Sequence, residues 1–304
     1  MSVRSSPGTV ARNTRRALRP GSGPIEAPTV LLVDIGNTRL KWAIWRAGEL
    51  SSRGARELRR FAARVPARTL LGAAGQIDRV LVSSVASSHV RRELARWVHG
   101  ELGLRAEFAR TQRRVRGLTT RYTDPWRLGV DRFLAALGAR HLAGSHPACI
   151  VSVGTAVTVD FVDGLGVHRG GVILPSPQLM IRSLLQNTSG IGRRARARAS
   201  ERTRDRTRDA DSALFARSTR AAIEEGARQA IGALIDRAMS DARQRLGRSP
   251  LLLITGGAAA ELAGSFRASP VHVPDLVLQG LALYGGLSLN APARIRPRPR
   301  RSHP

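Results

Sequence analysis

At 304 residues the chain is long enough for one large domain or for two smaller ones that share a cleft, and 42% hydrophobic with only 4% aromatic residues predicts an aliphatic core. The single cysteine, Cys149, excludes an internal disulfide and a multi-cysteine metal site, and no apolar run reaches the roughly 20 residues of a membrane span. The net charge of +28 favours anionic ligands, but the arginines are scattered and no nucleic-acid-binding motif stands out, so we expect no specific nucleic-acid partner and no membrane partner.

The first half of the chain predicts a basic tail followed by a hairpin. Residues 1–28 are rich in Arg, Ser, Gly and Pro and lack apolar periodicity, so we expect a disordered tail. A continuous apolar run at 29–33 then leads into a polar turn, and an alternating run follows at 40–45, which together indicate a β-hairpin. Beyond it we expect a helix at 55–75, a buried strand at 79–85 and a second helix at 88–103.

The second half repeats this unit. A helix at 131–142 precedes an apolar strand at 148–153, and residues 151–156 have the pattern of residues 33–38: strand, polar residue, apolar residue, glycine, hydroxyl-bearing turn. The repetition indicates a duplicated architecture. We place the junction at the small polar residues 143–147, and therefore expect domains at 29–145 and 146–290.

The remainder of the chain alternates helices with a strand. The arginine-rich stretch at 190–211 predicts an exposed loop with some helical tendency. The further elements that we expect are a helix at 212–246, a strand at 251–254, a helix from about Ala258 and a helix at 276–284. Residues 291–304 alternate Arg and Pro and predict a second disordered tail.

The first hairpin turn carries groups that suit phosphate. It consists of Asp34, Ile35, Gly36, Asn37, Thr38, Arg39, Leu40 and Lys41. A glycine after a strand brings backbone N–H groups close to a phosphate, and Lys41, the only lysine of the chain, adds a point charge. Asp34 is a candidate Mg²⁺ ligand. An ordinary hairpin with an exposed lysine is the alternative.

The second hairpin turn, from Ser152 to Asp160, predicts a similar arrangement across a cleft, with Thr155 facing the phosphates. Asp160 stands in an otherwise apolar strand, where it is either functional or on a solvated face. The turn Thr255-Gly256-Gly257 would allow a nucleoside to approach closely, although a turn of small residues is an equal reading.

The stretch Gly129-Val130-Asp131-Arg132 precedes an apolar helix. Asp131 is therefore either a helix N-cap or a general base that takes the proton of a substrate hydroxyl, with Arg132 holding an anionic substrate.

Taken together and in this order, these stretches resemble the type III pantothenate kinases of the acetate and sugar kinase/Hsp70/actin superfamily. The resemblance covers about residues 29–288 and includes Gly170-Gly171-Val172-Ile173-Leu174-Pro175 and the segment from Ser218 to Gly226. It implies an α/β fold, a duplicated actin/hexokinase-like (ribonuclease H-like) two-domain fold with a central cleft.

The resemblance also implies a function. The expected reaction is the ATP-dependent phosphorylation of pantothenate to 4′-phosphopantothenate, the first step of coenzyme A biosynthesis, by a cytoplasmic homodimer. ATP with Mg²⁺ would lie at residues 34–41 and Thr155, with Asp131 as proton acceptor. Pantothenate would contact Gly129, Val130, Asp131 and Arg132, and Thr219 of the partner subunit.

Three positions depart from the family pattern. Ser152 replaces an aspartate that helps to bind a potassium or ammonium ion, so the need for a monovalent cation is in doubt. Ser176 and Ser218 replace a glycine and an asparagine. Two other functions stay open: a kinase of the same superfamily with another substrate, or a non-enzymatic regulatory relative that binds nucleic acid or a protein partner.

Overall fold

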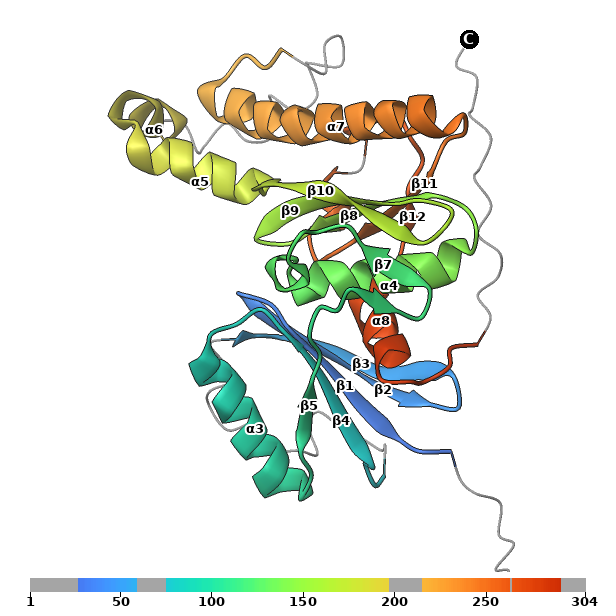
Figure 1. The fold of residues 1–304 in the computed structure, drawn as a ribbon. Coiled ribbons are helices and arrows are strands. Elements are labelled where there is room, and N and C mark those ends of the chain that lie inside the picture. The colour runs from blue at the N-terminus through green and yellow to red at the C-terminus, as the bar shows by residue number, and fades with distance from the viewer. Residues whose placement is uncertain (1–26, 59–74, 197–214, 263, 291–304) are drawn as a thin grey trace, which may run out of the picture.

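A computed structural model describes residues 27–58, 75–196, 215–262 and 264–290. Residues 1–26 of the first predicted tail and all of the second, 291–304, lie outside these residues. The described chain forms two mixed sheets with helices between and outside them (Figure 1).

The first sheet has five strands in the order β3-β2-β1-β4-β5. Helix α3 connects β4 to β5. The bounds of these elements are β1 (Val30–Ile35), β2 (Arg39–Arg46), β3 (Glu49–Glu57), β4 (Arg79–Ser84), α3 (Ser88–Leu102) and β5 (Ala106–Phe108).

The second sheet has seven strands in the order β12-β11-β8-β9-β10-β7-β6. Its strands are β6 (Arg114–Val115), β7 (Leu118–Thr120), β8 (Ala148–Val153), β9 (Ala156–Val162), β10 (Val167–Pro175), β11 (Leu251–Thr255) and β12 (Val271–His272). The helices of this part are the short η1 (Pro125–Arg127), α4 (Val130–Ala143), α5 (Pro177–Asn187), α6 (Ser189–Arg196), α7 (Thr219–Leu246), the short η2 (Ala259–Leu262) and α8 (Leu276–Tyr284).

The two sheets repeat one connectivity, which confirms the predicted duplication. β1 pairs antiparallel with β2 and parallel with β4, and β8 pairs in the same way with β9 and β11. The third strands, β3 and β10, pair with β2 and β9, and the fifth strands, β5 and β12, pair with β4 and β11. The second sheet is then extended by β7 and β6 beyond β10.

The central strands are mainly apolar because helices cover both of their faces. In β1, Val30 and Leu32 face the cluster that contains α4 and α8, whereas Leu31 and Val33 face α3. In β8, Cys149 instead faces α7, where it packs with Ile231 and Ile235. The layers therefore run from α3 through the first sheet, the α4–α8 pair and the second sheet to α7 (Figure 1).

Helices α4 and α8 approach each other through glycines. A β-carbon on Gly280 would lie 1.9 Å from the carbonyl oxygen of Leu134, and one on Gly138 would lie 2.6 Å from that of Leu276. No larger side chain fits at this crossing without a shift of backbone. α4 packs on β8 and β9, while α8, near the end of the described chain, packs on β1, β2 and β4.

Elements exchange between the two halves. β6 and β7 precede residue 145 but pair in the second sheet, and α8 follows residue 146 but covers the first. The division of the chain into domains at 29–145 and 146–290 therefore stays a prediction. It does not coincide with the separation between the two sheets and the helices that cover them. None of the helices among the described residues is long and apolar enough to span a membrane.

Several predicted elements need correction. Residues 55–57 belong to β3 and not to a helix, Leu58 is helical, and residues 59–74 of the predicted helix lie outside the described residues. The helix predicted from Ala258 is only the short η2. The stretch at 190–196 is part of α6, a regular helix rather than a loop, and 197–211 is outside the description. The helix predicted at 212–246 begins at Thr219 among the described residues.

Candidate functional site

The two hairpin turns face each other across the gap between the sheets. The hydroxyls of Thr38 and Thr155 lie 2.9 Å apart, although 117 positions separate them in the chain. Each turn is closed by its glycine, since the N–H of Gly36 donates to the carbonyl of Arg39 and that of Gly154 to the carbonyl of Ala156, both at 3.0 Å. Exposed hydroxyls on two opposed tight turns form a cradle for a phosphate chain.

Asp34 and Lys41 lie side by side at the base of the first turn, because Asp34 is paired with Lys41 across β1 and β2. Burial of the Asp34 carboxyl raises its pKa to about 6, and the hydroxyl of Ser83 partly offsets the rise. The negative charge of Asp131 raises the pKa further, whereas Lys41 lowers it. Three stretches that are distant in sequence therefore share one electrostatic environment.

The remaining residues of the first turn divide into core and surface. Ile35 and Leu40 are fully buried, so only their backbone can reach a ligand. Asn37 and Arg39 are exposed. The Arg39 guanidinium extends to the opposite half, where a β-carbon on Gly257 would lie 3.1 Å from its Nη1. The turn that follows β11 thus borders the same space.

Asp131 lies in the first turn of α4, whose N-cap is Gly129. Asp131 is therefore not the capping residue, and its Oδ1 accepts a hydrogen bond of 2.8 Å from the N–H of Arg132. Burial raises the pKa of the Asp131 carboxyl, against the lowering effect of that hydrogen bond and of the Arg132 charge. A β-carbon on Gly129 would lie 2.7 Å from Oδ1, so glycine leaves room for this carboxylate. The half-buried Val130 packs against the central core.

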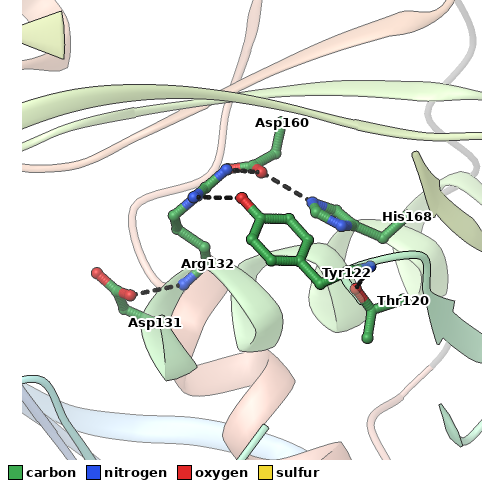
Figure 2. A network of polar contacts seen from close by, with 6 residues as sticks. All are labelled: Thr120, Tyr122, Asp131, Arg132, Asp160 and His168. Atoms are coloured by element: carbon green, nitrogen blue, oxygen red, sulfur yellow. Dashed lines mark hydrogen bonds and ion pairs between the residues drawn. The ribbon is translucent and has the colours of Figure 1, made fainter. Parts of the chain in front are cut away.

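Arg132 is buried and already bonded to protein. Its Nε and Nη2 donate to the two oxygens of Asp160 at 2.9 and 2.6 Å, and its Nη1 donates to the hydroxyl of Tyr122 at 3.1 Å (Figure 2). His168 contacts the same carboxylate, with 2.8 Å between Nε2 and Oδ1. The contact of Arg132 with an anionic substrate stays a prediction, and the ion pair with Asp160 limits how it can be made. Any substrate contact must use the N–H groups that remain.

Tyr122 and His168 were missed by the sequence interpretation. Tyr122 is one of only two tyrosines in the chain and lies nine positions before Asp131, a weak signal at best. The pairing of His168 with Thr120 between β10 and β7 brings both side chains to the site, with ring centroids 5.9 Å apart. No sequence pattern predicted β7, so neither Tyr122 nor His168 could be connected to the motifs. Asp160 is only 2% exposed, which excludes the solvated-face reading.

Thr219 lies apart from these turns, at the start of α7. It lines a cavity of about 900 Å³ between α5, α6 and α7, and the side chains around it are mostly apolar. Leu179, Leu184 and Ile223 are among them, and the first two are exposed.

The described residues fit a divalent ion better than a monovalent one. Asp34, with its charged form available above pH 6 and Asp131 nearby, is the kind of single carboxylate that holds Mg²⁺ together with nucleotide phosphates. Ser152, by contrast, is paired with Thr158 and Thr255 on its neighbouring strands, so only hydroxyls meet at that row. Among the described residues no three His, Cys, Asp or Glu side chains gather as a metal cluster.

Two repeats of the same strand order, with their turns opposed, define the class: the actin/hexokinase-like fold of the acetate and sugar kinase/Hsp70/actin superfamily. The sequence model described as "Type III pantothenate kinase" matches residues 30–241. The chain belongs to this family.

Individual relatives agree. A type III pantothenate kinase from Nitrosococcus oceani is 32% identical over 257 residues, which are 83% of this chain and 92% of the relative. One from Janthinobacterium sp. (strain Marseille) is 35% identical over 259 residues, 83% and 95% of the two chains. A solved Campylobacter jejuni structure, described as a Baf family transcriptional activator, has a TM-score of 0.51 at 19% identity and covers 83% of this chain and 94% of its own. That likeness shows the fold alone.

In the absence of nucleotide, the ionised carboxylate of Asp34 should destabilise the folded protein. Because its pKa is about 6 when folded and about 3.9 when unfolded, its protonated form favours folding at low pH, and this contribution is lost as the pH rises through 6. Asp34→Asn should therefore raise the Tm at pH 8 by a few °C, a shift that corresponds to a change in the free energy of unfolding on the order of 1 kcal/mol, and should change the Tm little at pH 4. Thermal unfolding without ATP or Mg²⁺ measures this difference.

Asp124→Asn, at a half-exposed carboxylate, is the control and should give the same small shift at both pH values. A lower Tm for Asp34→Asn at pH 8 would contradict the electrostatic reading.

Proposed function

We propose that this chain transfers the γ-phosphate of ATP to the primary hydroxyl of pantothenate and releases ADP and 4′-phosphopantothenate. The observation that carries the proposal is the meeting of the two opposed turns, Thr38 against Thr155, with Asp131 close enough to Asp34 to shift its pKa. Family membership supplies the identity of the acceptor. ATP is made and used in the cytoplasm, which is the compartment that this proposal implies.

The phosphate chain would occupy the cradle between the turns. Asn37, Thr38 and Thr155 offer hydrogen-bond donors from two sides, and Lys41 and Arg39 offer positive charge. Transfer of a phosphoryl group depends mainly on positioning and on the stabilisation of charge, so groups on rigid turns suit the reaction.

Asp131 would act as the general base. Its raised pKa makes it a better proton acceptor than an exposed aspartate. As the acceptor oxygen forms its bond to the γ-phosphorus, the bond from phosphorus to the bridging oxygen of ADP breaks and the hydroxyl proton moves to Asp131. Gly129 and Val130 would shape the backbone around the acceptor, and Arg132 would contact it through its two unbonded N–H groups.

Asp34 is the residue that would hold Mg²⁺ with the ATP phosphates, either directly or through water. The ion supplies neutralisation of the phosphate charge. We further propose that a monovalent cation is not required, because the row at Ser152, Thr158 and Thr255 offers hydroxyls but no carboxylate.

We also propose that two chains associate through the surface formed by α5, α6 and the start of α7. A cavity lies open between these helices, and exposed apolar side chains lie there and on the adjoining face of β10, namely Val172, Leu179 and Leu184. Burial of such a patch is a reason for association. The dimer would bring Thr219 of one chain toward the acceptor bound by the other.

Asp131→Asn tests the base. The variant keeps the size of the side chain but cannot take the proton, so pantothenate-dependent ADP release should fall by roughly 10²–10⁴-fold while the protein stays folded and the KM for ATP changes little. Near-normal turnover would refute the role of Asp131. Absence of any pantothenate-dependent ADP release in the wild type, with ATP and Mg²⁺ present, would refute the proposed function and favour another acceptor or the regulatory alternative.

Ser152→Asp tests the cation site. The wild type should have the same turnover in potassium, in ammonium and in a buffer of a bulky organic cation. A carboxylate between Thr158 and Thr255 should introduce a dependence on potassium or ammonium, whereas Ser152→Asn, of equal size but uncharged, should not. A wild type that is inactive without potassium would show that other groups supply the site.

Leu184→Asp tests the association surface. A charge in this apolar patch should shift the mass in solution, measured by light scattering, from twice that of one chain to that of one chain, and should weaken pantothenate use because Thr219 of the partner is lost. Leu165→Asp is the control, since Leu165 is 81% exposed and lies at the opposite end of β10 from α5. A wild type with the mass of a single chain would contradict the proposal.

A further inference from the structure

Asp160 is a buried carboxylate that the reaction described above does not use. It lies in the middle of β9, its residue is 2% exposed, and Val159 and Val162 beside it belong to two different apolar clusters. A charged group in such a place is costly unless partners compensate it. The partners therefore indicate what the carboxylate is for.

Both oxygens of Asp160 are bonded. Oδ2 accepts from Nε of Arg132 at 2.9 Å, and Oδ1 accepts from Nη2 at 2.6 Å and lies 2.8 Å from Nε2 of His168. Burial opposes ionisation, but the hydrogen bonds from His168 and Arg132 outweigh it, and the pKa of Asp160 is lowered. The guanidinium is held in a two-point geometry that fixes its plane.

The backbone of β10 closes over this ion pair. Gly171 is opposite Asp160 in the strand register, and a β-carbon there would lie 2.4 Å from Oδ1 of Asp160 and 2.7 Å from Nη2 of Arg132. Any other residue would push the pair apart. The glycine is therefore a second, independent sign that the position of this guanidinium is closely constrained.

The network extends to the proposed site at two points. Arg132 follows Asp131 directly, and its backbone N–H is bonded to the Asp131 carboxylate. Its Nη1 is bonded to the hydroxyl of Tyr122, which lies beside it in Figure 2. The loop around Tyr122 is in turn held by Arg113, which donates to the carbonyl oxygens of Thr120, Tyr122 and Thr123 at 3.2, 2.5 and 2.6 Å.

A guanidinium has five N–H groups, and the contacts above use three of them. One N–H on each terminal nitrogen is left. Because Asp160 neutralises the charge and sets the plane, these two N–H groups have a fixed direction. They can serve as oriented hydrogen-bond donors rather than as a free positive charge.

We propose that Asp160, supported by His168, is a positioning residue for the phosphoryl acceptor: it aims the remaining N–H groups of Arg132 and the hydroxyl of Tyr122 at the acceptor, next to Asp131. The inference rests on the proposed function, since it assigns the acceptor to this side of the site. Asp160 itself touches no substrate and acts only through Arg132.

Asp160→Asn is the test, and Asp163→Asn is its matched control. Asp163 lies in the same β9–β10 hairpin, is 3% exposed and is also paired with an arginine, Arg169, but it bonds the N–H groups of its own turn, at Leu165 and Val167. Both variants remove a buried carboxylate from an arginine, so both should lose stability. Only Asp160→Asn should disturb the acceptor.

The measurements are thermal unfolding and steady-state ADP release with ATP and pantothenate each varied. For Asp160→Asn we expect kcat/KM for pantothenate to fall by roughly 10²-fold, the loss that a displacement of about 1 Å can cause, while the KM for ATP stays within a few-fold of the wild type. Asp163→Asn should keep both values. Equal kinetic parameters in the two variants would overturn the proposal and leave Asp160 a purely structural ion pair.

His168→Phe covers the case in which Asp160→Asn does not fold. It removes one hydrogen bond to Asp160 but keeps a ring against Tyr122, and it should raise the KM for pantothenate several-fold without a change in that for ATP. An unchanged KM for pantothenate would again overturn the inference. If the wild type releases no ADP in response to pantothenate, the proposed function fails and the inference falls with it, an outcome that the variants cannot imitate.

Discussion

The crossing of α4 and α8 holds the structure together, because α8 packs on the first sheet, α4 packs mainly on the second, and the two helices pack on each other. Gly138 and Gly280 set their separation, since a β-carbon on either would meet backbone atoms of the opposite helix. That separation determines how far apart the two sheets stand. The 2.9 Å contact between Thr38 and Thr155, at the edges of different sheets, is therefore a product of helix packing as much as of the turns themselves.

The same helix links the core to the chemistry. The first turn of α4 carries Asp131 and Arg132, and the next residues, Phe133 and Leu134, are fully buried. A carboxylate at the start of a rigid, buried helix loses little freedom when a ligand binds. The raised pKa values of Asp34 and Asp131 indicate what this arrangement costs the protein: burial disfavours the charged form of both carboxyls, and the charge of Asp131 adds to the rise at Asp34.

The sequence was sufficient for the strands that are buried on both faces and for the turns that follow them, because continuous apolar runs and glycine turns are local signals. It predicted the repeat from residues 33–38 and 151–156, which the shared strand order confirms. It was insufficient for β3, β6, β7 and β10, whose residues are mixed in polarity and whose pairing depends on distant strands. The partnership of Arg132 with Asp160 was missed for the same reason, since 28 positions separate residues that meet only when α4 packs on β9.

The placement of α8 has a consequence for the order in which the protein acquires its structure during synthesis. The face of β1 that carries Val30 and Leu32 is covered by a helix that begins at Leu276, so this apolar surface leaves the ribosome some 240 residues before its cover. Contacts between residues so far apart in sequence form slowly, and until they form the apolar surface stays exposed and prone to aggregation. A chaperone would therefore have the largest apolar surface to protect while the N-terminal sheet is complete and α8 is not yet synthesised.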